Sequence, residues 1–117
     1  MILVDTSVWV EHLRRGVPEL AAMLEAGDVL THTLVLGELA CGNLRNRARI
    51  LADLGALPFA PRATDDEALA FLENRQLMGR GVGIVDVHLL ASAALAGDAR
   101  LWTLDRRLAA VAEELGL

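Results

Sequence analysis

The N-terminal stretch MILVDTSVWV (residues 1–10) decides the fold, because its first buried segment ends on a charge. The apolar run of residues 2–4 is typical of a short strand in a parallel sheet. Asp5 follows it directly, and Thr6 or Ser7 can cap a helix that starts there. A carboxylate beside a core strand is costly to desolvate unless another group pairs with it. The stretch therefore predicts a strand, a helix, and an acid with a partner at their junction.

Further along the chain, short apolar runs alternate with helical patterns. Strands are predicted over residues 2–5, 28–32, 56–60 and 100–104, and helices over residues 6–16, 18–27, 33–44, 45–55, 64–79, 84–97 and 105–116. This alternation predicts an α/β fold, a three-layer α/β/α sandwich whose central parallel sheet has four strands with helices on both faces. No linker or internal repeat interrupts the pattern, so residues 1–117 are expected to form a single domain.

Composition narrows the classes of protein that the chain can belong to. The hydrophobic fraction is 54%, above the roughly 45–50% of soluble domains, which suggests a subunit interface and hence a homodimer. No apolar run approaches the ~20 residues of a membrane span, so no membrane association is expected. Cys41 is the single cysteine and cannot form an internal disulfide, which favours a cytoplasmic protein. We expect Cys41 to be a small core residue.

Charge and aromatic content exclude one group of nucleic-acid binders. The net charge is −5, whereas nucleic-acid-binding domains usually carry a basic footprint. Aromatic residues make up only 3% of the chain, so a base-stacking platform is not expected. Every basic residue is an arginine, whose planar fork suits phosphate better than the point charge of a lysine.

Four acids stand in or beside core-like sequence. Two of them, Asp5 and Asp105, follow predicted strands, whereas Glu38 and Asp86 lie in apolar helical segments. Strand ends and helix starts share one edge of a parallel sheet, so all four carboxylates can converge there. Helix capping is the simpler explanation for each acid alone, most of all for Asp105, and capping and metal binding can coexist.

Four carboxylates in one cleft need a compensating charge, because like charges raise each other's pKa values or force the cluster apart. Mg²⁺ or Mn²⁺ supplies that charge, since both ions prefer oxygen ligands and suit phosphate substrates. Such ions activate water and stabilise the attacking and leaving oxygens of a phosphodiester. Removing the four acids from a charge of −5 leaves −5 + 4 = −1, so the remaining surface need not repel RNA.

The motifs D5-T-S, E38-L-A-C-G42, G83-I-V-D86 and T103-L-D105 resemble the PIN domain family, specifically the VapC-type toxins of toxin–antitoxin pairs. The resemblance runs along nearly the whole chain, with the acids in the expected order. It implies a metal-dependent ribonuclease, inhibited by a VapB-like antitoxin and often dimeric, with Asp5, Glu38, Asp86 and Asp105 as its acidic residues. Small hydroxyl residues often stand beside the site in this family, and here they are Thr6, Ser7 and Thr103. The family often adds a strand after the last helix, so a fifth strand stays open.

Together these observations predict an RNA endonuclease that uses a four-carboxylate Mg²⁺ or Mn²⁺ site and leaves 5′-phosphate and 3′-hydroxyl ends. The alternative is a non-catalytic binding module whose acidic cluster grips an arginine-rich partner. A receiver-like signalling domain would need a lysine near its aspartate, and the chain has none. A dinucleotide-binding domain would need a glycine-rich turn after the first strand, where DTSVW stands instead.

Several arginines and one loop are candidates for phosphate contact. Arg45 and Arg49 are predicted to share a helix face, and Arg106 and Arg107 follow Asp105; solvent exposure alone explains them about equally well. Of these, Arg45, Arg49 and Arg106 are our candidate RNA contacts. The loop GRGVG (79–83) can cradle phosphate through its backbone amides, but a simple turn into the next helix explains it better.

Overall fold

The computed structural model describes residues 1–117 and contains a parallel sheet of three strands with seven helices. The strands are β1 (Ile2–Val4), β2 (Val29–Leu30) and β3 (Arg100–Trp102). The helices are α1 (Thr6–Arg15), α2 (Pro18–Ala26), α3 (Thr33–Cys41), α4 (Arg47–Gly55), α5 (Asp65–Arg75), α6 (Ile84–Ala96) and α7 (Arg106–Glu114). The predicted alternation of strands and helices is confirmed.

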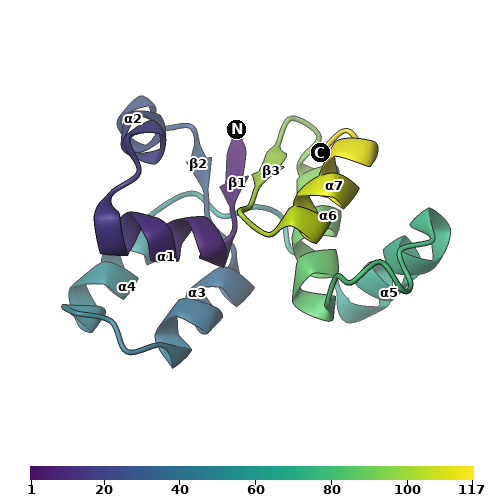
Figure 1. Cartoon of the computed structure of the whole chain (residues 1–117), viewed down its shortest axis with the longest axis horizontal. Coiled ribbons are helices and arrows are strands. Elements are labelled where there is room, and N and C mark those ends of the chain that lie inside the picture. Colours follow the sequence, from purple (N-terminus) through teal and green to yellow (C-terminus); the bar gives the residue numbers. More distant parts are fainter.

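The sheet has the order β2-β1-β3, so the N-terminal strand is its centre. Leu3 of β1 pairs with Leu30 on one side and with Leu101 on the other, both in parallel register. Figure 1 shows the strands between two groups of helices, with α1 to α4 on the β2 side and α5 to α7 on the β3 side. The carboxyl ends of the strands therefore open between the two groups.

The predicted fourth strand is not formed. Residues 56–60 reach the edge of the sheet, where Phe59 makes a single parallel bridge with Thr31. Thr31 donates its amide to the Pro58 carbonyl at 2.8 Å and its carbonyl accepts from the Ala60 amide at 2.9 Å, but Pro58 has no N–H with which to extend this ladder along β2. The fifth strand, which the sequence left open, is not formed either. The Leu117 carbonyl accepts one hydrogen bond from Leu101 of β3, and no strand forms there.

Helix starts follow local capping chemistry, but α3 ends at Cys41 and α5 at Arg75, both earlier than the predicted limits of residues 44 and 79. The predicted capping box of α5 is present, since Thr64 and Glu67 exchange hydrogen bonds of 3.1 and 2.9 Å. Helix α1 is capped by Asp5, not by Thr6 or Ser7. Helix α4 begins later than predicted, because Asn46 adopts a left-handed φ of 52° that no helix interior can contain.

The core lies where the two groups of helices meet the sheet. Its largest buried side chains include Leu3 of β1, Trp9 of α1 and Leu89 of α6. His32 is also fully buried: its Nδ1 accepts from the Leu34 amide and so caps α3. Cys41, in contrast, is exposed at the end of α3, so its predicted place in the core is wrong. None of the helices has the length and apolar character needed to cross a membrane.

Candidate functional site

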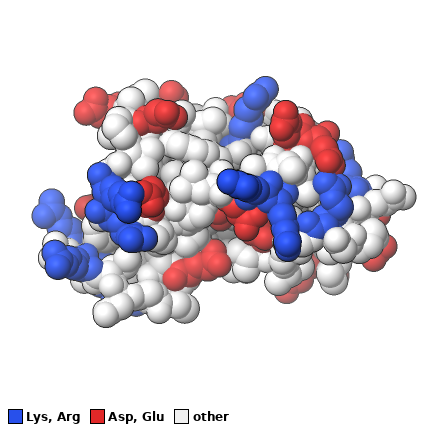
Figure 2. All heavy atoms as spheres, in the orientation of Figure 1, with Lys and Arg blue, Asp and Glu red and all other residues white.

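The four acids stand at the edge where the strands end. Asp5 follows β1 and Asp105 lies just beyond β3, and each caps the helix that begins next. Asp86 lies in the first turn of α6, and Glu38 lies in α3. In Figure 2, acidic side chains gather in the middle of the face between the two groups of helices, with basic side chains on both sides.

Asp5 is the most buried of the four acids and is held by two hydroxyl groups. Its Oδ2 accepts hydrogen bonds from the Ser7 Oγ at 2.7 Å and from the Thr103 Oγ1 at 2.8 Å. Each hydroxyl is itself oriented by a backbone amide, since Leu104 donates to Ser7 and Asp105 donates to Thr103. This network ties the ends of β1 and β3 together and fixes one oxygen of Asp5.

Glu38 reaches the same region from an exposed position on α3. Its Oε1 accepts a hydrogen bond of 2.6 Å from the Thr6 hydroxyl, at the start of α1. Thr6, Ser7 and Thr103, which the sequence marks as supporting residues, thus each contact one of the candidate acids. A contact of this kind orients a carboxylate without consuming both of its oxygens.

The pKa of the Asp86 carboxyl is affected by burial and by the charges of the other three acids. Burial raises the pKa of its carboxyl above the ordinary value, while a 3.0 Å hydrogen bond from the Gly83 amide acts in the opposite direction. The pKa is raised further by three neighbouring charges, those of Asp5, Asp105 and Glu38. Acids that are far apart in the sequence therefore act on one another in the fold.

The acids at helix starts do cap their helices, and capping does not prevent them from having a second role. The Asp105 Oδ1 accepts from the amides of Arg107 and Leu108 at 2.9 and 3.0 Å, which is an ordinary N-cap. Asp86 binds the amide of Gly83 at the start of α6 in a similar way. These bonds position the carboxylates, and whether the carboxylates also bind metal is a separate question.

The donor set of the cluster fits a hard divalent cation. Each carboxylate accepts its side-chain hydrogen bonds through one oxygen, and its other oxygen accepts none. The engaged oxygens are Oδ2 of Asp5, Oε1 of Glu38, Oδ2 of Asp86 and Oδ1 of Asp105. As the side chains stand, however, no three His, Cys, Asp or Glu residues are arranged to hold a metal ion. The four free oxygens suit Mg²⁺ or Mn²⁺ once the carboxylates turn toward a shared centre.

The candidate RNA contacts are scattered over the surface. Arg45 lies in the loop before α4, so it does not share a helix face with Arg49 as predicted. Arg49 lies 3.9 Å from Asp53 on the solvent side of α4. Arg106 is exposed at the first position of α7, directly after Asp105. Of the three, only Arg106 is close in sequence to a candidate acid.

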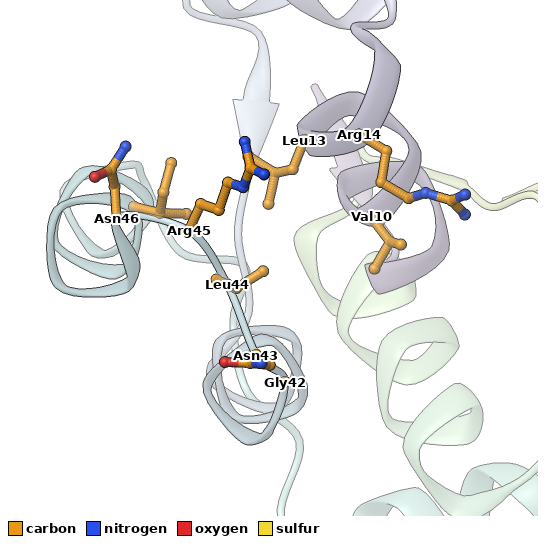
Figure 3. A pocket seen from close by; sticks show the side chains of 9 residues that line it. Val10, Leu13, Arg14, Gly42, Asn43, Leu44, Arg45 and Asn46 are labelled. Atoms are coloured by element: carbon orange, nitrogen blue, oxygen red, sulfur yellow. The ribbon is translucent and has the colours of Figure 1, made fainter.

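A groove that none of the four acids lines lies elsewhere on the protein. It has a volume of about 760 Å³ and runs between α1 and the segment that joins α3 to α4. Val10, Leu13 and Leu44 give it apolar walls, and Figure 3 shows the Arg45 side chain reaching across it toward Leu13. No carboxylate lines this groove, so it offers a surface for binding and not a site for metal chemistry.

Two features of the site have only weak signals in the sequence. The hydroxyl network around Asp5 depends on two residues that are 96 positions apart, Ser7 and Thr103. Arg107 packs on the backbone of Gly81, and GRGVG gives no sign of that contact except for its glycines. A glycine at a position of positive φ, followed by an acid at a helix start, is the signal that points to this loop.

Comparison with known proteins identifies one matching family and two proteins of similar sequence. The PIN domain family matches residues 2–114. The chain is 48% identical over 117 residues to Ribonuclease VapC32 from Mycobacterium tuberculosis strain CDC 1551 / Oshkosh. It is equally similar to the protein of the same name from strain H37Rv, and each match covers 100% of this chain and 94% of the relative.

Proposed function

Because this chain belongs to the PIN domain family and resembles its VapC-type toxins along its whole length, we propose that it is a ribonuclease toxin that cleaves RNA internally. The proposed site is the cluster of Asp5, Glu38, Asp86 and Asp105, with Mg²⁺ or Mn²⁺ as the cofactor. The observation that carries it is the effect of three acids on the pKa of the fourth, since such a cluster calls for a cation.

In this proposal the free oxygens of Asp5, Glu38 and Asp86 hold the principal ion, and Asp105 supports it or a second ion. Bound Mg²⁺ or Mn²⁺ supplies water activation and charge neutralisation at the phosphodiester. Ser7 and Thr103 bind one oxygen of Asp5, which leaves its other oxygen free of hydrogen bonds.

The test is cleavage of RNA by the purified protein. Asp86→Asn keeps an acceptor for the Gly83 amide but removes a charged ligand, so cleavage should fall by orders of magnitude while the fold persists. EDTA should abolish wild-type cleavage, and Mg²⁺ or Mn²⁺ should restore it. The matched control is Asp53→Asn on exposed α4, which should cleave like wild type. Cleavage by Asp86→Asn at the wild-type rate would refute the site.

The alternative is a binding module whose acids receive arginines from a partner. The exposed position of Glu38 is compatible with it, because this carboxylate is reachable from outside. Metal-dependent cleavage that yields 5′-phosphate ends would exclude the alternative. Purified protein that binds an arginine-rich peptide through these acids, but never cuts RNA with any divalent ion, would favour it.

The partners that we propose for this chain follow from its membership of the PIN domain family. We propose that the chain forms one domain, works as a cytoplasmic homodimer, and is inhibited by a VapB-like antitoxin. An arginine of the antitoxin can replace the charge of the cation in the acidic cluster and block RNA. Co-expression with the neighbouring reading frame tests this, because the antitoxin should co-purify with the chain and suppress its cleavage of RNA.

A further inference from the structure

Arg107, in the first turn of α7, lies against the backbone of the loop over residues 79–83. A Cβ atom at Gly81 would stand 2.5 Å from the Arg107 Cδ and 2.8 Å from its Nη1, closer than any real contact allows. Gly81 also has a φ of +80°, a conformation that other residues rarely adopt. Only glycine therefore leaves room for the arginine in this position.

The same loop is fastened to α7 a second time. The Arg80 guanidinium binds the Glu114 carboxylate with two hydrogen bonds of 2.9 and 2.8 Å, one to each oxygen. At its other end, the loop leads to Gly83, whose amide binds the Asp86 carboxylate. The loop thus connects α7 to the start of α6.

Arg107 is exposed, and its guanidinium group has no partner within the protein. It makes no ion pair and no hydrogen bond, although its own backbone amide binds the Asp105 carboxylate at 2.9 Å. By contrast, Arg80 is paired with Glu114, and Arg47 donates to the Ala40 carbonyl. The free fork of five N–H donors is suited to an oxyanion that comes from outside the protein.

We propose that Arg107 is a positioning residue that binds a phosphate of the RNA next to the bond that is cut. The inference rests on the proposed ribonuclease function and adds the residue that sets the register of the RNA. The Arg107 amide binds the Asp105 carboxylate and its side chain contacts Gly81, two residues before the Gly83 amide that binds Asp86, so the residue stands next to the segments that carry two of the four acids. Its contact with Gly81 distinguishes Arg107 from Arg106, the neighbouring candidate, for which the structure shows no such support.

The experiment measures binding of a fluorescently labelled, mixed-sequence single-stranded RNA in EDTA, where it is not cut, over a series of salt concentrations. Losing a charge-assisted contact should make Arg107→Ala bind about tenfold or more weakly. The slope of log affinity against log salt should fall by about 0.7, as expected for one lost phosphate contact. Arg100→Ala removes the same charge from the opposite end of β3 and should change neither quantity.

Gly81→Ala provides a second, independent variant. The new methyl group displaces Arg107, so this variant should also weaken RNA binding. The double variant Gly81→Ala/Arg107→Ala should bind no more weakly than Arg107→Ala alone, because both changes remove the same contact. Additive losses in the double variant would overturn the role of Gly81.

Two other outcomes separate this inference from the function on which it rests. If wild type cuts and binds RNA but Arg107→Ala retains its affinity and salt slope, the positioning role is wrong and the ribonuclease stands. If wild type neither binds nor cuts RNA, both proposals fail. A normal melting temperature for each variant excludes unfolding as the cause of weaker binding.

Discussion

At Asp86, a single side chain links stability to the proposed chemistry. Its raised pKa means that the folded, cation-free protein holds a proton to higher pH than the unfolded chain does. Stability from this group is fully present below the unfolded pKa, near 3.9, and is lost as pH rises through the raised folded value. Near neutral pH, Asp86→Asn should therefore melt higher than wild type in EDTA.

Mn²⁺ should reverse that order. At about a hundred times its dissociation constant, a ligand stabilises the native state by roughly 2.7 kcal/mol, and Asp86→Asn should gain much less than wild type. The measurement is a set of four melting curves, two proteins each with EDTA and with Mn²⁺. If Asp86→Asn melts lower in EDTA and gains as much from Mn²⁺ as wild type, then Asp86 is only a helix cap.

His32 predicts a pH dependence of the opposite sign. Burial, together with the smaller effects of the charges of Arg62 and His88, lowers the pKa of its ring from 6.5 to about 4. The neutral ring accepts from Leu34 and contacts the Ser92 hydroxyl at 2.9 Å. Its stabilising effect is fully present above pH 6.5 and is lost as pH falls through about 4. Between pH 7.5 and pH 5 this group should remove roughly 2 kcal/mol.

Urea unfolding of wild type and His32→Asn at the two pH values checks this prediction. Asparagine can still accept from the Leu34 amide, so the cap of α3 is kept while the titrating ring is lost. The variant should be less stable at pH 7.5, since the Ser92 contact and core volume are gone, but it should lose less stability on acidification. An equal loss in both proteins would mean that His32 does not govern the acid sensitivity.

The sequence identified the candidate acids because charges inside apolar runs stand out. The same reasoning failed for residues whose role depends on distant contacts. Cysteine is a residue type that is usually buried, but Cys41 lies exposed at a helix end. Nothing in the sequence around it distinguishes a buried cysteine from an exposed one. The sequence favoured Arg106 over Arg107 as an RNA contact, because it carries no sign of the contact between Arg107 and Gly81. Chemistry that is carried by residue type could be predicted, whereas long-range packing could not.

The groove of Figure 3, between α1 and the segment that leads into α4, joins apolar walls to positive charge. Val10 and Leu13 are 40% and 36% exposed, and Arg14 and Arg45 add positive charge in a chain of net charge −5. We expect the antitoxin to place a segment with apolar and acidic side chains there. Leu13→Asp should abolish co-purification of the antitoxin, because it puts a charge on the apolar wall.

The control for this prediction is Met78→Asp, which changes an apolar side chain outside the groove that is 51% exposed, more than Leu13. It should co-purify with the antitoxin as wild type does, and both variants should still cut RNA. If Leu13→Asp retains its antitoxin, the antitoxin binds elsewhere.

Among the elements, helices could be predicted better than strands. All seven predicted helices exist, because each has a helical pattern over nine residues or more and a recognisable end. The fourth strand failed at Pro58, whose missing N–H leaves a single bridge, between Phe59 and Thr31, directly after β2. Helix α4 starts later than predicted because the backbone of Asn46 adopts the left-handed conformation. Asparagine tolerates this conformation, but the presence of an asparagine in a sequence does not predict it.

For the whole molecule, the apolar surplus should appear as a subunit interface. Leu69 of α5 and Leu95 of α6 are both 52% exposed, and a hollow of about 350 Å³ beside Leu95 lies between these helices. We expect α5 and α6 to form the homodimer contact. Light scattering should show a dimer for wild type and a monomer for Leu95→Arg. A wild-type monomer at every practical concentration would contradict the dimer.

The central place of β1 has a consequence for the order in which the protein is made. β1 is synthesised first, but one of its two partners, β3, begins 98 residues after β1 does. Until then one edge of β1 is unpaired, and Asp5 lacks the Thr103 hydroxyl that holds it. A growing chain therefore carries an incomplete acidic cluster until its last elements are translated. We expect the ribosome to release a harmful enzyme only at the end of synthesis, which leaves time for a neutralising partner to meet it.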